Sequence, residues 1–200
     1  MRVSVTAVEN YRYYKGSDMP LADILSRLRK QDPPNDAMEA GKAFHSILEH
    51  ATDGGDMTDA VQDGWAFKFD LDAQISLPEV REVKGTAQHR VHGHDVTLVG
   101  VVDALQGRTV YDHKLSNRFD AERYLDSFQW RAYLSMFDAD CFIYNVFTAS
   151  RKGWSVTVRN FDALPLYRYP AMQADVERDL GEFVAFCLDN APDVLGRKAA

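Results

Sequence analysis

Residues 96–116, VTLVGVVDALQGRTVYDHKLS, decide the fold of this chain. Apolar residues flank a Gln-Gly-Arg turn at residues 106–108, which is the pattern of two β-strands joined by a tight turn. Because side chains alternate between the two faces of a strand, Asp103 shares a face with apolar neighbours, and so do Asp112 and Lys114 on the returning strand. Charges on such surfaces cost free energy unless they are paired or bind a metal ion.

Two interpretations of these three charged side chains are open at this point. Two carboxylates on neighbouring strands suit a hard metal ion with oxygen ligands, and a nearby ammonium can address a phosphate or a water. Alternatively, Asp103 closes its strand, as carboxylates often do, while Asp112 and Lys114 form an ordinary ion pair at a sheet edge. The choice depends on whether the rest of the chain supplies partners for them.

The composition is that of an ordinary soluble domain, with 200 residues of which 46% are hydrophobic and 26% charged. We expect one domain over residues 1–195 and a loose tail over residues 196–200. No apolar run approaches the roughly 20 residues that span a bilayer, and the N-terminus lacks a signal-peptide pattern. Cys141 and Cys187 lie in apolar surroundings, which predicts reduced thiols in a cytoplasmic protein. Two cysteines also exclude an iron–sulfur cluster held by four thiolates.

The net charge of −7 argues against a nucleic-acid partner, because phosphate binding usually requires a basic surface. Local charge can differ from net charge, however, and a metal site contributes acidic residues of its own. Basic residues gather in and after the proposed strand pair, at Lys114, Arg118, Arg123, Arg131, Arg151 and Lys152. The net charge therefore weakens the case for DNA binding without removing it.

The order of the predicted elements places the chain in the α+β (α/β) class. Helical periodicity predicts helices at residues 4–15, 21–29, 36–51, 121–137 and 170–188. Alternating or continuous apolar runs predict strands at residues 65–72, 80–91, 95–105, 108–115, 141–149 and 154–159. The stretches between them predict an acidic connection at residues 52–64, an irregular link at 161–169 and a loose end after 192. We expect a central mixed, mostly antiparallel sheet flanked by helices.

Details of the first and third helices bear on a site. Thr6 and Glu9 form a capping-box pattern at the start of the chain. Gly41 inside the third helix costs about 1 kcal/mol relative to alanine, which suggests close approach by another backbone or by a ligand. His45 lies one turn later, beside the apolar stripe. A histidine in such a place is more often a packed boundary residue than a metal ligand, and on this evidence alone both remain open.

The helix predicted at residues 121–137 carries a buried stripe that runs from Leu125 to Met136 and contains one amide, Gln129. A buried glutamine needs hydrogen-bond partners, although some only tie a helix to nearby backbone. Because this helix directly follows the strand of Asp112, Gln129 and Tyr133 can reach the edge of the proposed site.

Four more polar side chains precede the strand pair. Glu82 on the strand before it could reach the carboxylates, although strand surfaces commonly carry glutamate. His89, His92 and His94 are spaced closely enough to suggest zinc, but they bracket a hairpin turn with no cysteine nearby. We expect these three histidines to be solvated.

Taken in order, short motifs of this chain resemble those of RecB-type nuclease domains in the PD-(D/E)XK superfamily. Residues 41–45, GKAFH, resemble the GxxxH motif, and residues 100–103, GVVD, resemble the G-x-x-D strand. Residues 111–114, YDHK, resemble the D-x-K core, and residues 129–133, QWRAY, resemble the QxxxY motif. The resemblance covers roughly residues 3–150, and the ordered set is far more specific than any one motif.

The resemblance implies a single PD-(D/E)XK nuclease domain with a restriction-endonuclease-like core that hydrolyses phosphodiester bonds in DNA. His45, Asp103 and Asp112 would bind one or two Mg²⁺ or Mn²⁺ ions, with the backbone carbonyl of His113 as a further ligand. Lys114 would orient or activate the attacking water and stabilise charge on the phosphate. Support of the site and contacts to nucleic acid would come from Gln129, Tyr133, Arg118 and Arg131, with Glu82 as a further candidate.

Some features depart from the wider family. His113 stands where an aromatic or small apolar residue is commoner, the iron–sulfur cysteines of some relatives are absent, as in compact lambda-type phage exonucleases, and there are no helicase motifs. By analogy we expect an exonuclease of DNA recombination, repair or phage DNA processing, in a bacterial cell or phage-infected host. Expected partners are DNA and a single-strand annealing or recombination protein, without a membrane, and a homo-oligomer is compatible with the sequence. The alternatives are a regulatory nucleic-acid-binding protein that has lost catalysis and a metal-dependent hydrolase that does not act on DNA.

Overall fold

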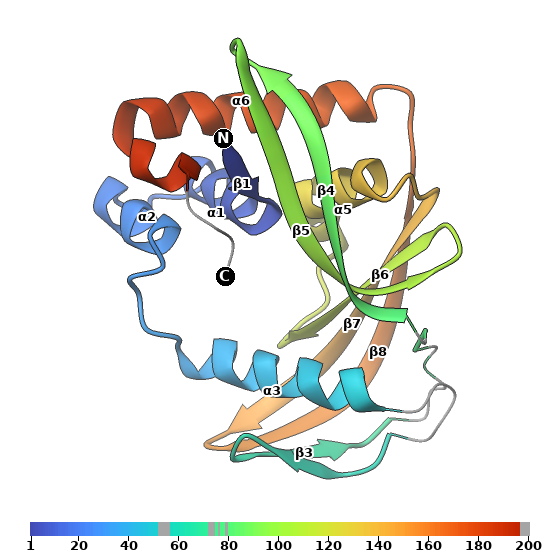
Figure 1. The fold of residues 1–200 in the computed structure, drawn as a ribbon. Helices are drawn as coiled ribbons and strands as arrows, with labels where there is room; N and C mark the ends of the chain where they lie inside the picture. Colours follow the sequence, from blue (N-terminus) through green and yellow to red (C-terminus); the bar gives the residue numbers. More distant parts are fainter. Residues whose placement is uncertain (52–56, 72–74, 76, 79, 197–200) are drawn as a thin grey trace.

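One mixed sheet organises the structure, a computed structural model that describes residues 1–51, 57–71, 75, 77–78 and 80–196 (Figure 1). Its strands are β1 (Arg2–Ser4), β2 (Ala60–Gln62), β3 (Trp65–Phe69), β4 (Val80–Val91), β5 (His94–Gln106), β6 (Thr109–Ser116), β7 (Cys141–Lys152) and β8 (Ser155–Tyr167). Their order is β1–β5–β6–β7–β8–β3–β2, and β4 also pairs with β5. Four of these pairings are antiparallel and three are parallel, which confirms the predicted mixed, mostly antiparallel sheet.

Helices cover both faces of this sheet. They are α1 (Val5–Lys15), α2 (Leu21–Leu28), α3 (Asp36–His50), α4 (Ala121–Asp126), α5 (Phe128–Met136) and α6 (Met172–Asn190), and a 3₁₀ turn follows at Pro192–Gly196. Alternate residues of β7 belong to different cores, because side chains alternate between the faces of a strand. Tyr144 and Val146 pack in the core that α1, α2, α5 and α6 share, whereas Phe147 packs 4.8 Å from the ring of Phe44 on α3.

Strand β5 changes its partner along one edge. β1 pairs in parallel with residues 97–99, and β6 pairs antiparallel with residues 104–106. No described strand pairs with residues 100–103 on that edge, whereas β4 follows the opposite edge along most of the strand. Buried backbone groups need hydrogen-bond partners, so side chains have to satisfy this gap. The residues singled out from the sequence gather there.

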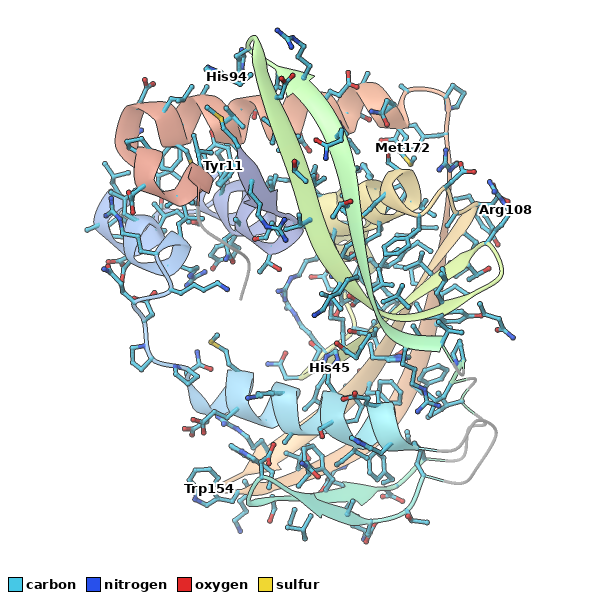
Figure 2. The ribbon with its side chains drawn as sticks, viewed as in Figure 1. Tyr11, His45, His94, Arg108, Trp154 and Met172 are labelled. Atoms are coloured by element: carbon cyan, nitrogen blue, oxygen red, sulfur yellow. The ribbon has the colours of Figure 1, made fainter. Side chains whose placement is uncertain are left out.

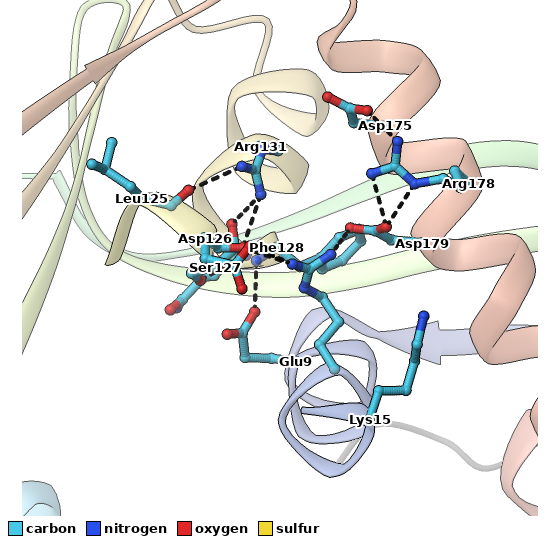
Figure 3. Close-up of polar contacts among 12 residues, drawn as sticks. Glu9, Lys15, Leu125, Asp126, Ser127, Phe128, Arg131, Asp175, Arg178 and Asp179 are labelled. Carbon is cyan, nitrogen blue, oxygen red and sulfur yellow. Dashed lines mark hydrogen bonds and ion pairs between the residues drawn. The ribbon is translucent and has the colours of Figure 1, made fainter. Parts of the chain in front are cut away.

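The single helix predicted over residues 121–137 is wrong, because the chain forms two helices that meet at Ser127. The hydroxyl oxygen of Ser127 accepts a hydrogen bond from the backbone N–H of Gln129 at 3.1 Å. A carboxylate oxygen of Glu9 on α1 accepts one from the N–H of Phe128 at 2.8 Å (Figure 3). These side chains satisfy free donors at the start of α5, which makes the break stable.

The break also corrects two expectations about single side chains. Leu125, predicted inside the buried stripe, is 45% exposed because it belongs to α4, which ends before α5 begins and does not continue its buried stripe. The predicted capping box of Thr6 and Glu9 does not form, since Ser4 caps α1 by accepting a hydrogen bond from the N–H of Ala7. Glu9 caps α5 instead.

Strand boundaries differ from the prediction at both ends of the chain. The short strands β1 and β2 were not predicted, and the irregular link expected at residues 161–169 is wrong because β8 continues to Tyr167. Pro165 fits inside β8 because β3 pairs only with its first part, up to Val158, so the rest of β8 is an edge on that side. The described part of the strand predicted at 65–72 ends at Phe69.

The chain after α6 is packed rather than loose up to residue 196. Val194 and Leu195 in the 3₁₀ turn are buried in the core that α1, α2, α5 and α6 share. Residues 197–200 of the expected tail lie outside the described residues, and so do residues 52–56 of the expected acidic connection. Among the described helices, none has the length and apolar character needed to cross a membrane.

Candidate active site

Side chains form hydrogen bonds at residues 100–103 of β5, where no described strand pairs with that edge. A carboxylate oxygen of Asp103 accepts a hydrogen bond from the backbone N–H of His113 at 2.6 Å. The hydroxyl of Tyr133 donates to the backbone carbonyl of Val101 at 2.8 Å. The β5–β6 ladder ends just before Asp103, so the two strands diverge where the D-x-K segment continues. Asp103 therefore lies at the point where β5 and β6 diverge, which we call the opening between the two strands.

Asp112 faces this opening from β6 and has a side chain that is only 4% exposed. Its Oδ1 accepts a hydrogen bond from Nε2 of Gln129 at 2.6 Å, and Nζ of Lys114 lies 2.6 Å from its Oδ2. Oδ2 is thus paired with the ammonium of Lys114 and has no further hydrogen-bond donor among the described residues. A buried carboxylate oxygen in this state would be stabilised by a further cation or water.

His45 approaches Asp103 from the face of the sheet that α3 covers, which is opposite to the face of Asp112 and Tyr144. It lies on the side of α3 that faces the central strands, and its Nδ1 is 3.4 Å from a carboxylate oxygen of Asp103 (Figure 2). Phe44 packs α3 into the core that contains Phe147, and Arg81 of β4 donates hydrogen bonds to carbonyls in the last turn of the helix. These contacts fix the position from which His45 reaches the site.

The charges of the site shift one another's pKa values. Burial raises the pKa of Asp112 to about 6, with Lys114 acting to lower it and Asp103 to raise it. Burial also acts to raise the pKa of Asp103, but the hydrogen bond and charge of His45 outweigh it and bring that pKa down to about 2. Burial acts to lower the pKa of Lys114, but Asp112 and Asp103 raise it above its ordinary value. Opposite shifts of two adjacent carboxylates are typical of functional sites.

The backbone N–H of His113 faces Asp103, whereas its side chain packs on the face of the sheet that carries Phe147. Burial lowers the pKa of its imidazole to about 4, so the ring is neutral near pH 7. Nδ2 of Asn145 lies 3.3 Å from Nδ1 of His113. The unusual residue at this position of the D-x-K motif is thus accommodated by packing away from the carboxylates.

Glu82 lies opposite Asp103 in the register of β4 and β5, between the pairs Arg81–Ala104 and Val83–Val102. Its φ of +53° is in the left-handed region, which is uncommon for a residue with a side chain. Burial and the charge of Asp103 raise the pKa of Glu82, although the residue is largely exposed. Strained backbone of this kind clusters at functional sites. The structure therefore brings Glu82 to the rim of the opening.

The donor set suits Mg²⁺ or Mn²⁺ by its chemistry, since two carboxylates, a backbone carbonyl and an imidazole are ligands that these ions accept. Oδ2 of Asp112, which has Lys114 as its ion-pair partner and no further donor among the described residues, can serve as one of these ligands. No three His, Cys, Asp or Glu side chains in the described part of the chain are close enough to share one ion. Lys114 and His45 instead pair with the carboxylates, so an ion would bind with a rearrangement of these pairs.

The two arginines predicted to contact nucleic acid have different surroundings. The guanidinium of Arg131 donates to the carbonyls of residues 125–127, which holds the break between α4 and α5 (Figure 3). It also donates to the hydroxyl of Tyr169. Arg118 lies in the loop after β6 with 79% of its side chain exposed, 3.5 Å from Asp120. A nucleic-acid contact stays a prediction for both residues.

The expectation that all three histidines near the β4–β5 hairpin are solvated is wrong for one of them. His89 is only 8% exposed rather than solvated, and neither of its ring nitrogens has a hydrogen-bond partner among the described residues. Nε2 of His92 lies 3.0 Å from the carbonyl of Gly181 on α6. His94 is exposed, as expected. The hairpin packs against α6, and this contact between distant segments is why His89 is buried.

Gly100 makes room for Tyr133, so the G-x-x-D and QxxxY segments fit together. A Cβ at Gly100 would lie 2.4 Å from Cε1 of Tyr133 and 2.9 Å from its hydroxyl oxygen. We expect Gly100→Ala to lower the free energy of unfolding by about 1–3 kcal/mol through overpacking, as measured by urea denaturation.

Gly41→Ala is the matched control for this prediction. A Cβ at Gly41 would meet no described atom within 4 Å, so the expected approach of another backbone is wrong and the variant should be neutral or slightly stabilising. Equal destabilisation by both substitutions would contradict the role of Gly100.

Comparison with known proteins identifies the same fold. No protein-family model matches this chain, and no curated protein matches it significantly. Among solved structures the chain is similar to SSO0001, with 16% identity and a TM-score of 0.56 over 92% of this chain and 76% of that chain. It is also similar to LHK-Exo, an alkaline exonuclease from Laribacter hongkongensis solved in complex with dAMP, with 12% identity and a TM-score of 0.50 over 96% and 89% of the two chains. A candidate exonuclease from Eubacterium rectale has 10% identity and a TM-score of 0.56 over 96% and 82%. The chain thus has a fold that exonuclease structures share.

Proposed function

We propose that this protein is a metal-dependent DNA exonuclease that hydrolyses phosphodiester bonds at the opening between β5 and β6. The observation that carries the proposal is Asp112, which is almost fully buried, paired with Lys114 through Oδ2 and positioned by Gln129 through Oδ1. An ordinary edge ion pair does not account for these features, because burying a charge is costly and surface pairs remain solvated. The shared fold with exonuclease structures supports the same activity.

Each matched residue has a proposed role. Asp103, Asp112, His45 and the carbonyl of His113 would hold Mg²⁺ or Mn²⁺, with Glu82 available at the rim. When bound, the ion would polarise the phosphate and lower the pKa of a bound water. The protein contributes the placement of these donors on both strands and on α3.

Lys114 supplies positive charge to the reacting phosphate. About a third of its side chain is exposed (32%), so its ammonium can reach a ligand while it remains next to Asp112. Its raised pKa keeps it protonated near neutral pH, which lets it donate a hydrogen bond to a phosphate oxygen or to the attacking water. Gln129 and Tyr133 position the site, because they fix Asp112 and the backbone of Val101.

Linear and covalently closed forms of the same plasmid test the exonuclease proposal. With Mg²⁺ or Mn²⁺ we expect loss of linear DNA, survival of the closed circle and no reaction in EDTA, all resolved on an agarose gel. Cutting of the circle would make the protein an endonuclease. Failure to cleave linear duplex or single-stranded DNA with either ion would contradict the enzyme proposal and favour a nucleic-acid-binding protein without catalysis. The proposed setting, with a recombination protein as partner in DNA processing in the cytoplasm, rests on the family resemblance.

A further inference from the structure

A separate cavity lies beyond the proposed catalytic lysine, at the end of β6. Its volume is about 580 Å³, and it is lined by Leu71, Phe119, Thr148, Arg159, Asn160, Phe161 and Asp162. This volume is within the range of small-molecule sites. Aromatic rings, an amide, a hydroxyl and a guanidinium are the groups with which proteins stack on and hydrogen-bond to an unpaired nucleobase.

The register of the sheet places this cavity next to Lys114. Ser116, two residues after Lys114 on β6, pairs with Thr148 of β7, and Thr148 pairs with Asn160 of β8. With about 3.3 Å per residue along a strand and about 4.8 Å between strands, the Cα atoms of Lys114 and Thr148 are about 8 Å apart. Alternation puts the side chains of Lys114, Thr148 and Asn160 on one face of the sheet. A nucleotide next to the reacting phosphate can reach the cavity.

A row of aromatic rings runs from Lys114 to the cavity. Nζ of Lys114 lies 6.0 Å from the ring centroid of Tyr144, and that ring is 4.8 Å from the ring of Tyr124. The ring of Phe119 stacks on Tyr124 at 6.2 Å and 21°. Phe119 is still 38% exposed and lines the cavity, so it keeps ring surface on which a base can stack.

Two local irregularities mark the same cavity. The pairs Thr148–Asn160 and Ala149–Val158 leave Arg159 as the extra residue of a β-bulge, a feature that re-aims side chains and is common beside active sites. Oγ1 of Thr148 is buried and has no hydrogen-bond partner among the described residues. An unsatisfied hydroxyl costs free energy, and a rotation of this side chain toward a ligand in the cavity would relieve that cost.

We propose that this cavity binds one unpaired nucleobase of the substrate strand, at a nucleotide next to the scissile phosphate. Phe119 stacks on the base, Asn160 and Thr148 bond to its edge, and Arg159 contacts the neighbouring backbone phosphate. The identity of the substrate rests on the proposed nuclease function. A base cannot enter such a cavity while it is stacked in a duplex, so the strand is single-stranded at this point.

Binding of free nucleosides tests the cavity without any requirement for DNA cleavage. Saturation-transfer NMR with deoxyadenosine and deoxycytidine should show that both nucleosides bind to the wild type. Their affinity for Phe119→Ala should be lower by a factor of roughly ten or more. Trp154→Ala removes an aromatic that is 60% exposed at the turn between β7 and β8 and does not line the cavity, so it should leave binding unchanged. No binding to the wild type, or equal binding to Phe119→Ala, would overturn the proposal.

Thr148→Val separates a binding role from a folding role. The substitution keeps the shape of the side chain and removes a hydroxyl that has no described partner, so thermal stability should be unchanged or higher. Weaker nucleoside binding by this stable variant is expected. Unchanged binding would remove Thr148 from the proposed site.

Abasic scanning then tests the placement of the base. Single-stranded oligonucleotides that lack one base each are titrated in EDTA, and fluorescence anisotropy reports their affinity. Loss of one particular base should weaken binding roughly tenfold in the wild type and have no effect in Phe119→Ala. An affinity that depends on no single base, in a protein that cleaves linear DNA, would overturn the cavity and retain the nuclease. Nucleoside binding without DNA cleavage would overturn the nuclease and retain the cavity.

Discussion

Lys114→Met is expected to lower the rate of DNA hydrolysis about 100- to 1,000-fold, the usual effect of removing one group that stabilises charge in a transition state. Lys114 forms an ion pair with Asp112, and a third of its side chain is accessible to a ligand. Methionine keeps most of the apolar stem and removes the charge. The loss should fall on kcat, because in the proposed mechanism the ammonium acts on the reacting phosphate.

The control for this variant is Lys68→Met, at an exposed lysine on β3. It changes the net charge by the same amount and should leave the rate unchanged. Circular dichroism has to show that Lys114→Met is folded, which we expect because burial already raises the pKa of Asp112 to about 6 and a proton can neutralise it. Hydrolysis within a few-fold of the wild type would rule out the proposed role of Lys114.

Arg12→Met is expected to lower the free energy of unfolding by about 2–4 kcal/mol, because it removes a partner of a buried carboxylate. The guanidinium of Arg12 pairs with Asp179 on α6, whose side chain is 4% exposed. It also donates to the backbone carbonyl and the carboxylate of Asp126 at 2.9 Å, so it joins α1 to α6 and to the break between α4 and α5. Arg178 also contacts Asp179, which keeps the expected loss below that of an isolated buried pair.

Lys15→Met gives a matched comparison on the same helix. Lys15 also pairs with a carboxylate of α6, Glu182, but both side chains are close to half exposed (48% and 41%). A pair of this kind contributes about 1 kcal/mol or less. Urea denaturation of the two variants should therefore separate them clearly, and equal losses would contradict the importance of burial at Asp179.

Local pattern was enough to predict most of the elements that carry the site. The strand pair over residues 96–116 follows from alternation around one tight turn, and the helix of His45 follows from its apolar stripe. The sequence therefore placed Asp103, Asp112 and Lys114 on neighbouring strands. Their grouping with Gln129 is seen in the contacts of Asp112.

Features that depend on distant segments could not be predicted in this way. The break at Ser127 leaves helical periodicity intact on both sides, and one of its stabilising partners, Glu9, is 119 residues away. The gap on the edge of β5 exists because β1 and β6 pair with different parts of that strand, and β1 is too short to be recognised from periodicity. The strained backbone of Glu82 also has no sequence signal, since glutamate is common on strands.

The central claim is that Asp112 helps to hold a divalent ion on which hydrolysis depends. The most direct measurement is the rate of nucleotide release from end-labelled linear DNA by the wild type and by Asp112→Asn, over a range of Mg²⁺ and Mn²⁺ concentrations. Asparagine has the same shape and can still accept the hydrogen bond from Gln129, so the variant removes the charge and the ion pair with Lys114 but keeps that contact. We predict ion-dependent release by the wild type and about 1,000-fold slower release by Asp112→Asn, which more ion does not restore. Release by Asp112→Asn near the wild-type rate, or release by the wild type in EDTA, would contradict the claim.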